Sequence, residues 1–429
     1  MRSSYLPEDV VLLLKDITGF VQPQPTEERE KLIQSGRHYS EMLPVEYVPT
    51  EKYMEVYREV LGRYAKQVAN AVGVLSDKII AARGKDVVLV SLARAGTPIG
   101  ILIRRYIKRK YGVEAPHYSI SIIRGRGIDD NAMKYLLDRY EPGQLLFVDG
   151  WIGKGAILGE LEKDMKAYPH VSPEIAVVAD PAGVTELCGT HEDILIPSSC
   201  LNSTVSGLVS RTFLRDDIIG EKDFHGAVFY EELRDSDLSY EFIEAIEKYF
   251  MPEEGNTCEQ QKPTGAVREV SDENQGVSGV LEEKPDKTQG ASGMPGEEPE
   301  ETQGASGMPG EEPEETQGAS GMPGGKFGET QGASGMPEEK SGGKGIDEVR
   351  EIAAFFGIED INFVKPGIGE TTRVLLRRVP WKVLIDERYR GAPELSHVVR
   401  LAEEKSVPVE YYPMIHYKCC GIIKKIADA

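Results

Sequence analysis

A fourteen-residue repeat divides the chain and limits what its middle can fold into. The string TQGASGMP begins at Thr288, Thr302, Thr316 and Thr330, and a diverged copy, NQGVSGVL, precedes them by one period. Every full copy contains Gly and Pro, and its apolar residues are only Ala and Met, so neither a helix nor a coiled coil can propagate. Such a composition buries too little apolar area to offset the entropy lost on ordering. We therefore expect residues 253–345 to be a disordered linker, with a recognition or phase-separating repeat as the alternative.

Charge and cysteine usage narrow the class of protein. Residues 253–345 hold 20 acidic against 7 basic side chains, whereas residues 346–429 hold 13 of each, so the net charge of −21 comes mostly from the middle. Such acidity favours solubility and says little about mechanism. The five cysteines show no C-x-x-C spacing and are too few for a disulfide framework. With no apolar run long enough for a membrane span, we expect a reduced, cytoplasmic protein with no metal-binding motif.

The two regions beside the repeat carry an alternating α/β pattern. In residues 1–252, apolar runs of strand length such as DVVLV, LLFVD and EIAVVA alternate with helical stretches. This pattern predicts a parallel sheet covered by helices on both faces. Residues 346–429 repeat it on a smaller scale, which predicts a compact α/β/α domain, with Cys419 and Cys420 at the buried start of a helix.

Three turns in the first region combine glycines with cationic side chains at the ends of predicted strands, where ligands bind in open α/β sheets. The turn SLARAGTP holds Arg94, which suits a phosphate clamp, although its Gly and Pro also suit a plain loop. The turn DGWIGKG joins Asp149 to Lys154, which suits a phosphorylated sugar, and it lacks the residues of a Walker A loop. The turn IIRGRGID carries Arg124 and Arg126, which suit a lid over a polyphosphate or a solvated basic loop.

The order of the first two turns resembles the type I phosphoribosyltransferase fold. The wider set SGRHYSEMLPVE, SLARAGTP, YSISIIRGRGID, VDGWIGKGA and VVADPAG is similar to bacterial proteins labelled cysteine protease StiP. Those proteins are also described as a phosphoribosyltransferase family associated with tellurium resistance and stress. The resemblance covers about residues 1–250.

This resemblance implies an enzyme that binds phosphoribosyl pyrophosphate and Mg²⁺ and transfers the phosphoribosyl group to a base or amine. Two positions differ from the pattern usual in that family. Gly150 replaces a second acid, and Lys154 stands where Thr is usual. Asp180 would face the acceptor or form a turn, and His38 could reach the site. The implied catalytic residues are Arg124, Arg126 and Asp149, and the implied ligand-binding residues are Arg94, Ala95, Gly96, Thr97, Asp149, Gly150, Gly153, Lys154, Gly155 and Ala156.

Two alternatives belong to other functional classes. The first is a non-catalytic nucleotide-binding sensor, which the missing second acid favours. The second is a cysteine protease, for which the candidate pair is Cys200 and His191, nine residues apart in the sequence. A cysteine nucleophile needs a base within hydrogen-bond reach, and no papain or caspase signature surrounds Cys200.

The C-terminal region resembles the RNA-binding domain shared by kink-turn-binding ribosomal proteins and Pelota. The family's recognition turn, G-x-N-E-x-T/S-K, corresponds to GIGETTR here, with glycine in the asparagine position. The resemblance implies that RNA is a partner, with Glu370 accepting from a guanine edge and Arg373 pairing with phosphate. An α/β module for protein contacts is the alternative. The implied RNA-binding residues are Gly367, Gly369, Glu370, Arg373 and Arg377.

Overall fold

A six-stranded parallel sheet forms the centre of the N-terminal region. The computed structural model describes residues 1–250 and 344–425. Its strand order is β1-β4-β3-β7-β8-β9, and all five pairings are parallel. The predicted parallel sheet is therefore confirmed. The strands are β1 (Val11–Leu12), β3 (Val88–Leu92), β4 (His117–Ile120), β7 (Leu145–Trp151), β8 (Ile175–Ala179) and β9 (Cys188–Thr190).

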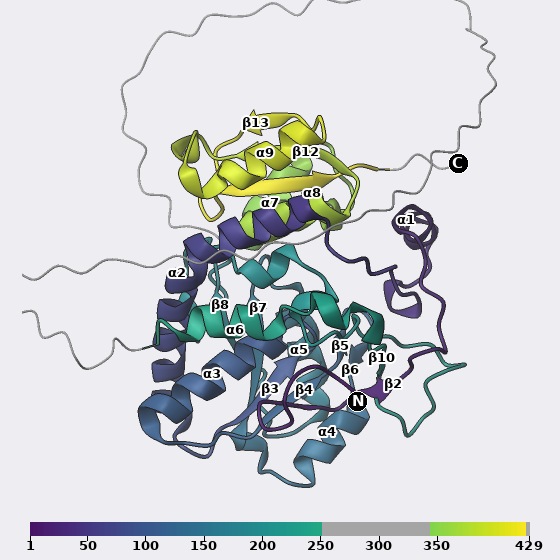
Figure 1. Ribbon diagram of the computed structural model, residues 1–429, viewed down its shortest axis with the longest axis vertical. Helices are drawn as coiled ribbons and strands as arrows, with labels where there is room; N and C mark the ends of the chain where they lie inside the picture. Colours follow the sequence, from purple (N-terminus) through teal and green to yellow (C-terminus); the bar gives the residue numbers. More distant parts are fainter. Residues whose placement is uncertain (251–343, 426–429) are drawn as a thin grey trace, which may run out of the picture. The chain divides into compact units, whose positions relative to one another are not determined.

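Helices cover both faces of this sheet, because alternate side chains of each buried strand enter different apolar cores. Leu89 and Leu146 pack with the helices α2, α3 and α6, whereas Val90 and Phe147 pack with α4 and α5 (Figure 1). All four side chains are fully buried. The helices are α1 (Thr26–Gln34), α2 (Glu51–Arg83), α3 (Gly96–Tyr111), α4 (Asp130–Leu137), α5 (Ala156–Asp164) and α6 (Ser239–Glu247).

Two short ribbons accompany the main sheet. Strand β2 (Lys15–Asp16) pairs in parallel with β10 (Gly226–Ala227). Strands β5 (Ile122–Ile123) and β6 (Gly127–Ile128) form an antiparallel pair. The turn predicted to act as a lid is thus the tip of this second ribbon, and Gly125 at its centre has a positive φ of 79°, which glycine adopts without steric strain.

The C-terminal region is a second, smaller α/β fold. Its four strands lie in the order β11-β14-β12-β13, with β12 and β13 parallel and the other pairings antiparallel. The predicted helix start at Cys419 and Cys420 is wrong, because both cysteines lie in the buried strand β14, between β11 and β12. The elements are α7 (Gly345–Phe355), β11 (Val364–Pro366), α8 (Ile368–Arg377), β12 (Pro380–Ile385), α9 (Ser396–Glu404), β13 (Val409–Tyr411) and β14 (Cys419–Ile423).

The two described regions, residues 1–250 and 344–425, pack into one compact unit. One apolar cluster is continuous across them, because Leu375 and Leu376 of α8 join side chains of α2 and the main sheet. The hydroxyl of Tyr53 in α2 also donates a hydrogen bond to the carbonyl of Leu376. The predicted linker, 253–345, lies outside the described residues except for its last two, of which Gly345 begins α7; its boundaries stay predictions.

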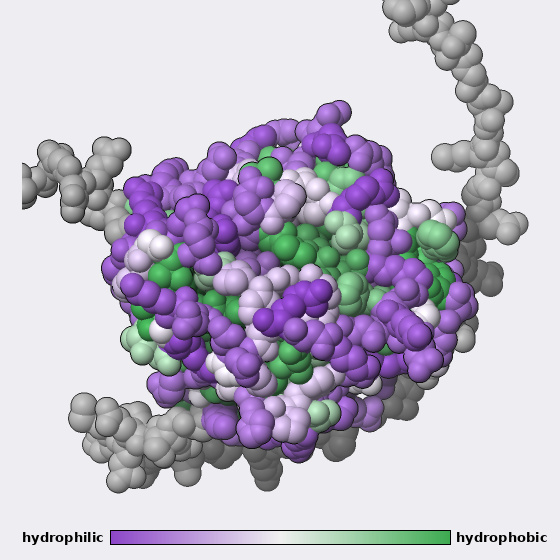
Figure 2. All heavy atoms as spheres, turned by 90° about the horizontal axis from the view of Figure 1, so that it is seen from below, coloured by the Kyte–Doolittle hydropathy of each residue, from purple (hydrophilic) through white to green (hydrophobic). Residues whose placement is uncertain are grey.

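One face of the described regions is mainly polar (Figure 2). Figure 2 shows hydrophilic residues over most of one face, with apolar residues gathered in patches between them. Among the helices of residues 1–250 and 344–425, none has both the length and the apolar composition needed to cross a bilayer. The strand order and the covering helices establish a mixed α/β fold, whereas a phosphoribosyltransferase-type fold stays a prediction.

Candidate functional site

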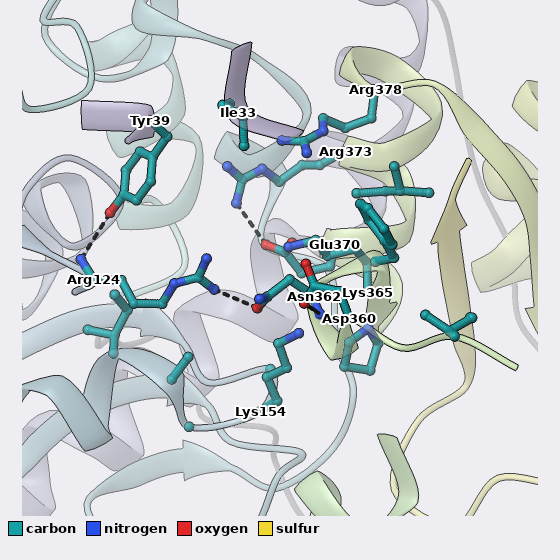
Figure 3. A pocket seen from close by; sticks show the side chains of 18 of the residues that line it. Ile33, Tyr39, Arg124, Lys154, Asp360, Asn362, Lys365, Glu370, Arg373 and Arg378 are labelled. Carbon is teal, nitrogen blue, oxygen red and sulfur yellow. Dashed lines mark hydrogen bonds and ion pairs between the residues drawn. The ribbon is translucent and has the colours of Figure 1, made fainter. Parts of the chain in front are cut away.

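A cavity of about 1010 Å³ lies beyond the ends of β7 and β11 and beside the start of α8. It is lined by side chains of both described regions (Figure 3). Sequence analysis singled out nine of the lining residues, which the fold brings together around one space. They are Ala95, Arg124, Asp149, Gly153, Lys154, Gly155, Ala156, Glu370 and Arg373.

The remaining residues of the predicted phosphate loops do not line this cavity. The guanidinium of Arg94 lies 3.3 Å from the carboxylate of Glu46 and donates to the carbonyl of Val209 at 2.9 Å. Thr97 is buried, and its hydroxyl lies 2.8 Å from that of Ser119. Gly96 is a packing residue, because a Cβ there would lie 2.3 Å from the carbonyl oxygen of Val148. Gly150, Arg126 and Arg377 are also absent from the lining.

Asp149 and Lys154 enter the cavity with pKa values shifted by burial. The Asp149 carboxylate accepts the Gly150 N–H at 2.7 Å, and burial raises its pKa to about 7 against the effect of this bond. Lys154 Nζ donates to the carbonyls of Ile361 at 2.8 Å and Val364 at 3.2 Å. Burial, followed by the charge of Lys365, lowers the pKa of Lys154 to about 8. Both groups therefore titrate near neutral pH.

The donor set does not suit the Mg²⁺ that the resemblance implied. In residues 1–250 and 344–425, no group of three or more His, Cys, Asp or Glu side chains is arranged to hold a metal ion. Of the cavity's two inner carboxylates, Asp149 stands among cations and Glu370 accepts from Arg373 at 2.8 Å. Magnesium prefers several oxygen ligands, so we derive no chemical step through it.

The predicted RNA-recognition turn is packed against the N-terminal region. The buried carboxylate of Asp193 accepts the backbone N–H of Ile368 at 3.0 Å and that of Lys418 at 2.9 Å. A Cβ on Gly369 would lie 3.6 Å from Ser199 Oγ. Burial raises the pKa of Asp193 to about 6, although its two hydrogen bonds oppose the shift. The start of α8 is therefore an internal contact in this structure.

The predicted thiol–imidazole pair involves a different cysteine from the expected one. Cys200 is buried in a short 3₁₀ turn, and burial raises its pKa to about 12. The neighbour of His191 is instead Cys188, whose Sγ lies 3.4 Å from Nε2 and 3.8 Å from Nδ1 of that imidazole. The pairing of Cys200 with His191 is thus not present in the described structure.

Asp180 completes the cluster around His191. The Nδ1 atom of His191 lies 3.0 Å from the carbonyl oxygen of Asp180 and 3.7 Å from its carboxylate Oδ2. With the proton on Nδ1, the ring donates to this carbonyl and Nε2 is left unprotonated as a base, while Cys188 Sγ lies beside the ring at similar distances from both nitrogens. Cys188, His191 and Asp180 therefore form the chain of thiol, base and orienting group that nucleophilic catalysis uses.

Within this cluster the thiol is buried, whereas the imidazole is exposed to solvent. Cys188 is fully buried, whereas the His191 side chain is 54% exposed. Asp180 Oδ2 also accepts the N–H groups of Val184 at 2.7 Å and Thr185 at 2.8 Å. These bonds fix residues 181–187, whose Ala182 and Val184 belong to the same apolar cluster as Cys188. Burial raises the pKa of this thiol, while the charge of Lys78 opposes the shift.

Comparison with known proteins decides the family. A protein-family model described as "Tellurite-like stress resistance cysteine protease StiP" matches residues 3–247 of the 429. The chain belongs to the StiP family. A second model, described as "PELOTA RNA binding domain", matches residues 343–425. No solved structure matches.

A curated relative supports the assignment to the StiP family. "Cysteine protease StiP" of Acinetobacter baylyi (strain ATCC 33305 / BD413 / ADP1) is 38% identical over 256 residues. The match covers 57% of this chain and 66% of the relative, so the chain spans just under two thirds of the relative's length. The StiP-family region, residues 3–247, contains Cys188, His191 and Asp180.

These findings overturn the prediction of a phosphoribosyltransferase. The matching family model and the curated StiP relative both carry the name of a cysteine protease. The sequence suggested that Arg94 binds pyrophosphate in the turn SLARAGTP. In the structure its guanidinium instead contacts Glu46 and the carbonyl of Val209, so the turn has no cation facing a phosphate. The protease alternative is the better supported of the functions that the sequence raised.

The sequence pointed to His191 but paired it with Cys200, nine residues away, and passed over Cys188, three residues before it. The string CGTH places thiol and imidazole three residues apart, with Cys188 beginning β9 and His191 just after its end. The useful signal is the preceding strand, because β8 runs parallel to β9 and ends next to Asp180. An acid and a histidine after two adjacent parallel strands meet at one edge of the sheet.

Proposed function

We propose that this StiP-family protein is a cysteine peptidase with Cys188 as its nucleophile. The observation that carries the proposal is the 3.4 Å contact between Cys188 Sγ and His191 Nε2. His191 is the general base, and the backbone carbonyl of Asp180 orients it through Nδ1. The names of the matching family model and of the curated relative support this reading.

The proposed reaction is acyl transfer through a thioester. Cys188 Sγ attacks the carbonyl carbon of a peptide bond as its proton passes to His191 Nε2. The tetrahedral intermediate collapses, the C–N bond breaks, and the imidazolium returns the proton to the leaving amine. Water then attacks the thioester with His191 again as base, which releases the acid and restores the thiol. Peptide entry requires residues 181–187 to move off the buried sulfur.

Thiol alkylation tests the assignment of the nucleophile. We expect iodoacetamide to abolish hydrolysis of a fluorescently labelled denatured protein by the full chain, in step with carbamidomethylation of Cys188 as residues 181–187 open for substrate. Peptide mapping by mass spectrometry measures the modification of each cysteine. Cys200 serves as the internal control, because it is buried like Cys188 but has no imidazole at hydrogen-bond distance among the described residues. Full hydrolysis by protein that is quantitatively modified at Cys188 would reject the proposal.

We infer RNA binding as a second function, carried by residues 344–425. The match to the Pelota RNA-binding domain supports it, as do Lys365 before α8, Arg373 within it and Arg378 at its C-terminal end. The start of α8 is also held by Asp193, so RNA contact at Gly367 and Glu370 competes with packing against the StiP-family region.

Release of this contact is expected to strengthen RNA binding. In Asp193→Ala, loss of two hydrogen bonds to a buried carboxylate frees the start of α8, and affinity for a kinked RNA rises by about tenfold. Fluorescence anisotropy of the full chain measures the change. Glu192→Ala is the matched control, because Glu192 is exposed and, among the described residues, its carboxylate accepts a hydrogen bond from Gln67 at 3.4 Å. Absence of saturable RNA binding by wild type and Asp193→Ala alike would contradict the inference.

A further inference from the structure

The cavity beside α8 carries a surplus of positive charge that the peptidase chemistry does not use. Its lining contains nine arginine or lysine residues against four acidic ones. Cys188, His191 and Asp180 are not among the lining residues. Figure 3 shows cationic side chains from both regions turned toward the same space, Arg124 and Lys154 from one and Lys365, Arg373 and Arg378 from the other.

Two of the inner cations contact neutral groups. Arg124 donates to the side-chain amide oxygen of Asn362 at 2.7 Å, and Lys154 donates to two backbone carbonyls. Within the described residues, no group accepts from the buried Nε of Arg211. The ion pair between Arg373 and Glu370 at 2.8 Å neutralises one of these charges. Arg124, Lys154 and Arg211 therefore form no ion pair with a carboxylate among the described residues.

These cations destabilise one another. Burial lowers the pKa of Lys365, and the charges of Arg378, Arg373 and Arg124 lower it further, although Glu370 opposes them. Burial, followed by the charges of Arg29 and Arg94, lowers the pKa of Arg211 to about 9. A buried charge is costly unless it is paired. An anion that enters the cavity supplies the missing partner and turns this repulsion into attraction.

We propose that the cavity binds a multiply charged phosphate ester that contacts cationic side chains of both regions at once. Guanidinium groups match phosphate oxygens with paired hydrogen bonds, and an ammonium adds a compact charge. A volume of about 1010 Å³ admits a whole nucleotide and not only an inorganic ion. The rings of Tyr39 and Trp151 in the lining offer surfaces on which a base can stack.

The phosphate groups can belong to a free nucleotide or to the end of an RNA strand, and the experiment separates these two sources. The ligand binds without any bond being made or broken, so the proposal is independent of the peptidase reaction. Because both regions supply cations, ligand binding also strengthens their packing and raises the melting temperature of the full chain.

Calorimetric titration of the full chain with ATP, inorganic pyrophosphate and a six-nucleotide RNA tests the site. We expect saturable binding of at least one probe, weakened at least about tenfold in Lys365→Met and in Lys154→Met, because each removes a cation from a different region. Lys163→Met is the matched control, since this lysine lies on the solvent side of α5 with its side chain 68% exposed. Preference for ATP identifies a nucleotide, and preference for the oligomer identifies an RNA end.

Thermal unfolding of the ligand-free protein shows whether Lys365 serves to bind the phosphate ester or to stabilise the fold. Lys365 has no ion-pair partner among the described residues. We therefore expect the melting temperature of Lys365→Met to equal or exceed that of wild type. A stable Lys365→Met protein that has lost affinity supports the proposal. Unchanged affinity in both variants, or no saturable binding of any phosphate probe by wild type, overturns it.

Discussion

Substitution of Cys188 by alanine is expected to lower the rate of peptide hydrolysis by at least about a thousandfold, the scale seen when a catalytic nucleophile is removed. The residual rate is that of the bound peptide with water. Hydrolysis of a labelled denatured protein by the full chain measures the loss, and circular dichroism confirms that the variant is folded. The apolar surroundings of Cys188 accept the smaller methyl group of alanine without an unsatisfied polar atom.

Cys200→Ala is the matched control for this substitution. Both cysteines are buried and lie in the same StiP-family region, but Cys200 has no imidazole at hydrogen-bond distance among the described residues. We therefore expect Cys200→Ala to keep the wild-type rate. If Cys188→Ala hydrolyses peptides as fast as wild type while Cys200→Ala is inactive, the nucleophile is Cys200 and the proposed site is wrong.

The rate of peptide hydrolysis by the wild-type protein should also rise between pH 7 and pH 9. Burial raises the pKa of the Cys188 thiol above its ordinary value of about 9. The fraction of reactive thiolate therefore still increases at pH 9. We expect hydrolysis to be faster at pH 9 than at pH 7.

The sequence predicted the sheet well because buried parallel strands leave a local signature. Continuous apolar runs identified β3, β7 and β8, although α3 begins at Gly96, inside the predicted turn SLARAGTP. The period of the pattern even determines which side chains enter which core, as Leu89 and Val90 illustrate. These properties depend on neighbours only a few residues apart, so composition and spacing suffice to predict them.

The roles of single polar residues were harder to predict because their partners are distant in sequence. Arg94 lies in a turn typical of phosphate binding, yet its carboxylate partner Glu46 is 48 residues away. Lys154 contacts the carbonyl of Ile361, 207 residues further along the chain. No local pattern contains such pairings, and the same turn can therefore hold a phosphate or a carboxylate.

The packing between the two regions escaped sequence analysis for a similar reason. Residues 253–345 suggested a tether between independent domains, and the glycines of GIGETTR suggested an exposed recognition turn. Those glycines also allow close packing, since Gly369 approaches Ser199 and a buried Asp193 accepts two backbone amides there. A small-residue turn is compatible with an RNA surface and with an internal interface, and only the three-dimensional partner distinguishes them.

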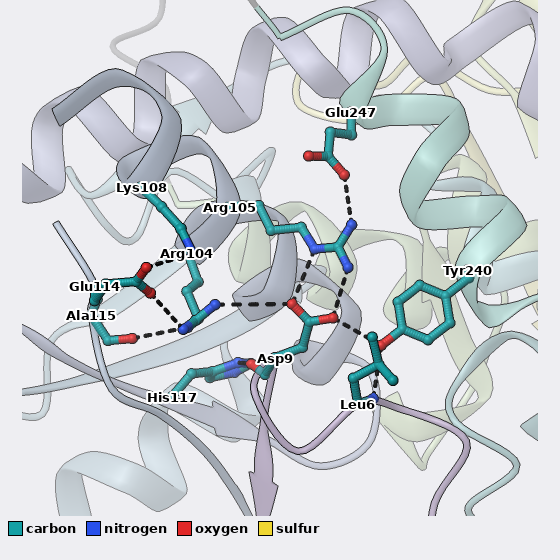
Figure 4. Close-up of polar contacts among 10 residues, drawn as sticks. All are labelled: Leu6, Asp9, Arg104, Arg105, Lys108, Glu114, Ala115, His117, Tyr240 and Glu247. Atoms are coloured by element: carbon teal, nitrogen blue, oxygen red, sulfur yellow. Dashed lines mark hydrogen bonds and ion pairs between the residues drawn. The ribbon is translucent and has the colours of Figure 1, made fainter. Parts of the chain in front are cut away.

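A second large effect, on the free energy of unfolding, is expected from substitution of Asp9. This residue links the N-terminal segment to two helices (Figure 4). Its buried carboxylate accepts two hydrogen bonds from Arg105, at 3.0 and 2.7 Å, and one from the hydroxyl of Tyr240 at 2.8 Å. The backbone carbonyl of Asp9 lies 2.7 Å from Nδ1 of the buried His117. This residue therefore joins the segment before β1 to α3, α6 and β4.

Asp9→Ala is expected to lower the free energy of unfolding by about 3–5 kcal/mol at pH 7, the usual effect of removing one partner of a buried ion pair. Arg105 keeps Glu247 at 2.6 Å, but its Nε and Nη2 lose their acceptor. Urea unfolding measures the change. Glu231→Ala is the control and should have no measurable effect, because Glu231 pairs with Arg234 in solvent.

The pH dependence of this difference tests whether the charge of Asp9 is responsible. Burial would raise the pKa of Asp9, but the hydrogen bonds and charge of Arg105 hold it below its ordinary value of about 3.8. A lowered pKa contributes stability above the unfolded-state value and loses it as the pH falls through the folded-state value. The gap between wild type and Asp9→Ala should thus be constant from pH 7 to about 5 and shrink below about 4. A gap that persists unchanged in acid would mean that packing of the side chain, and not its charge, holds the segment in place.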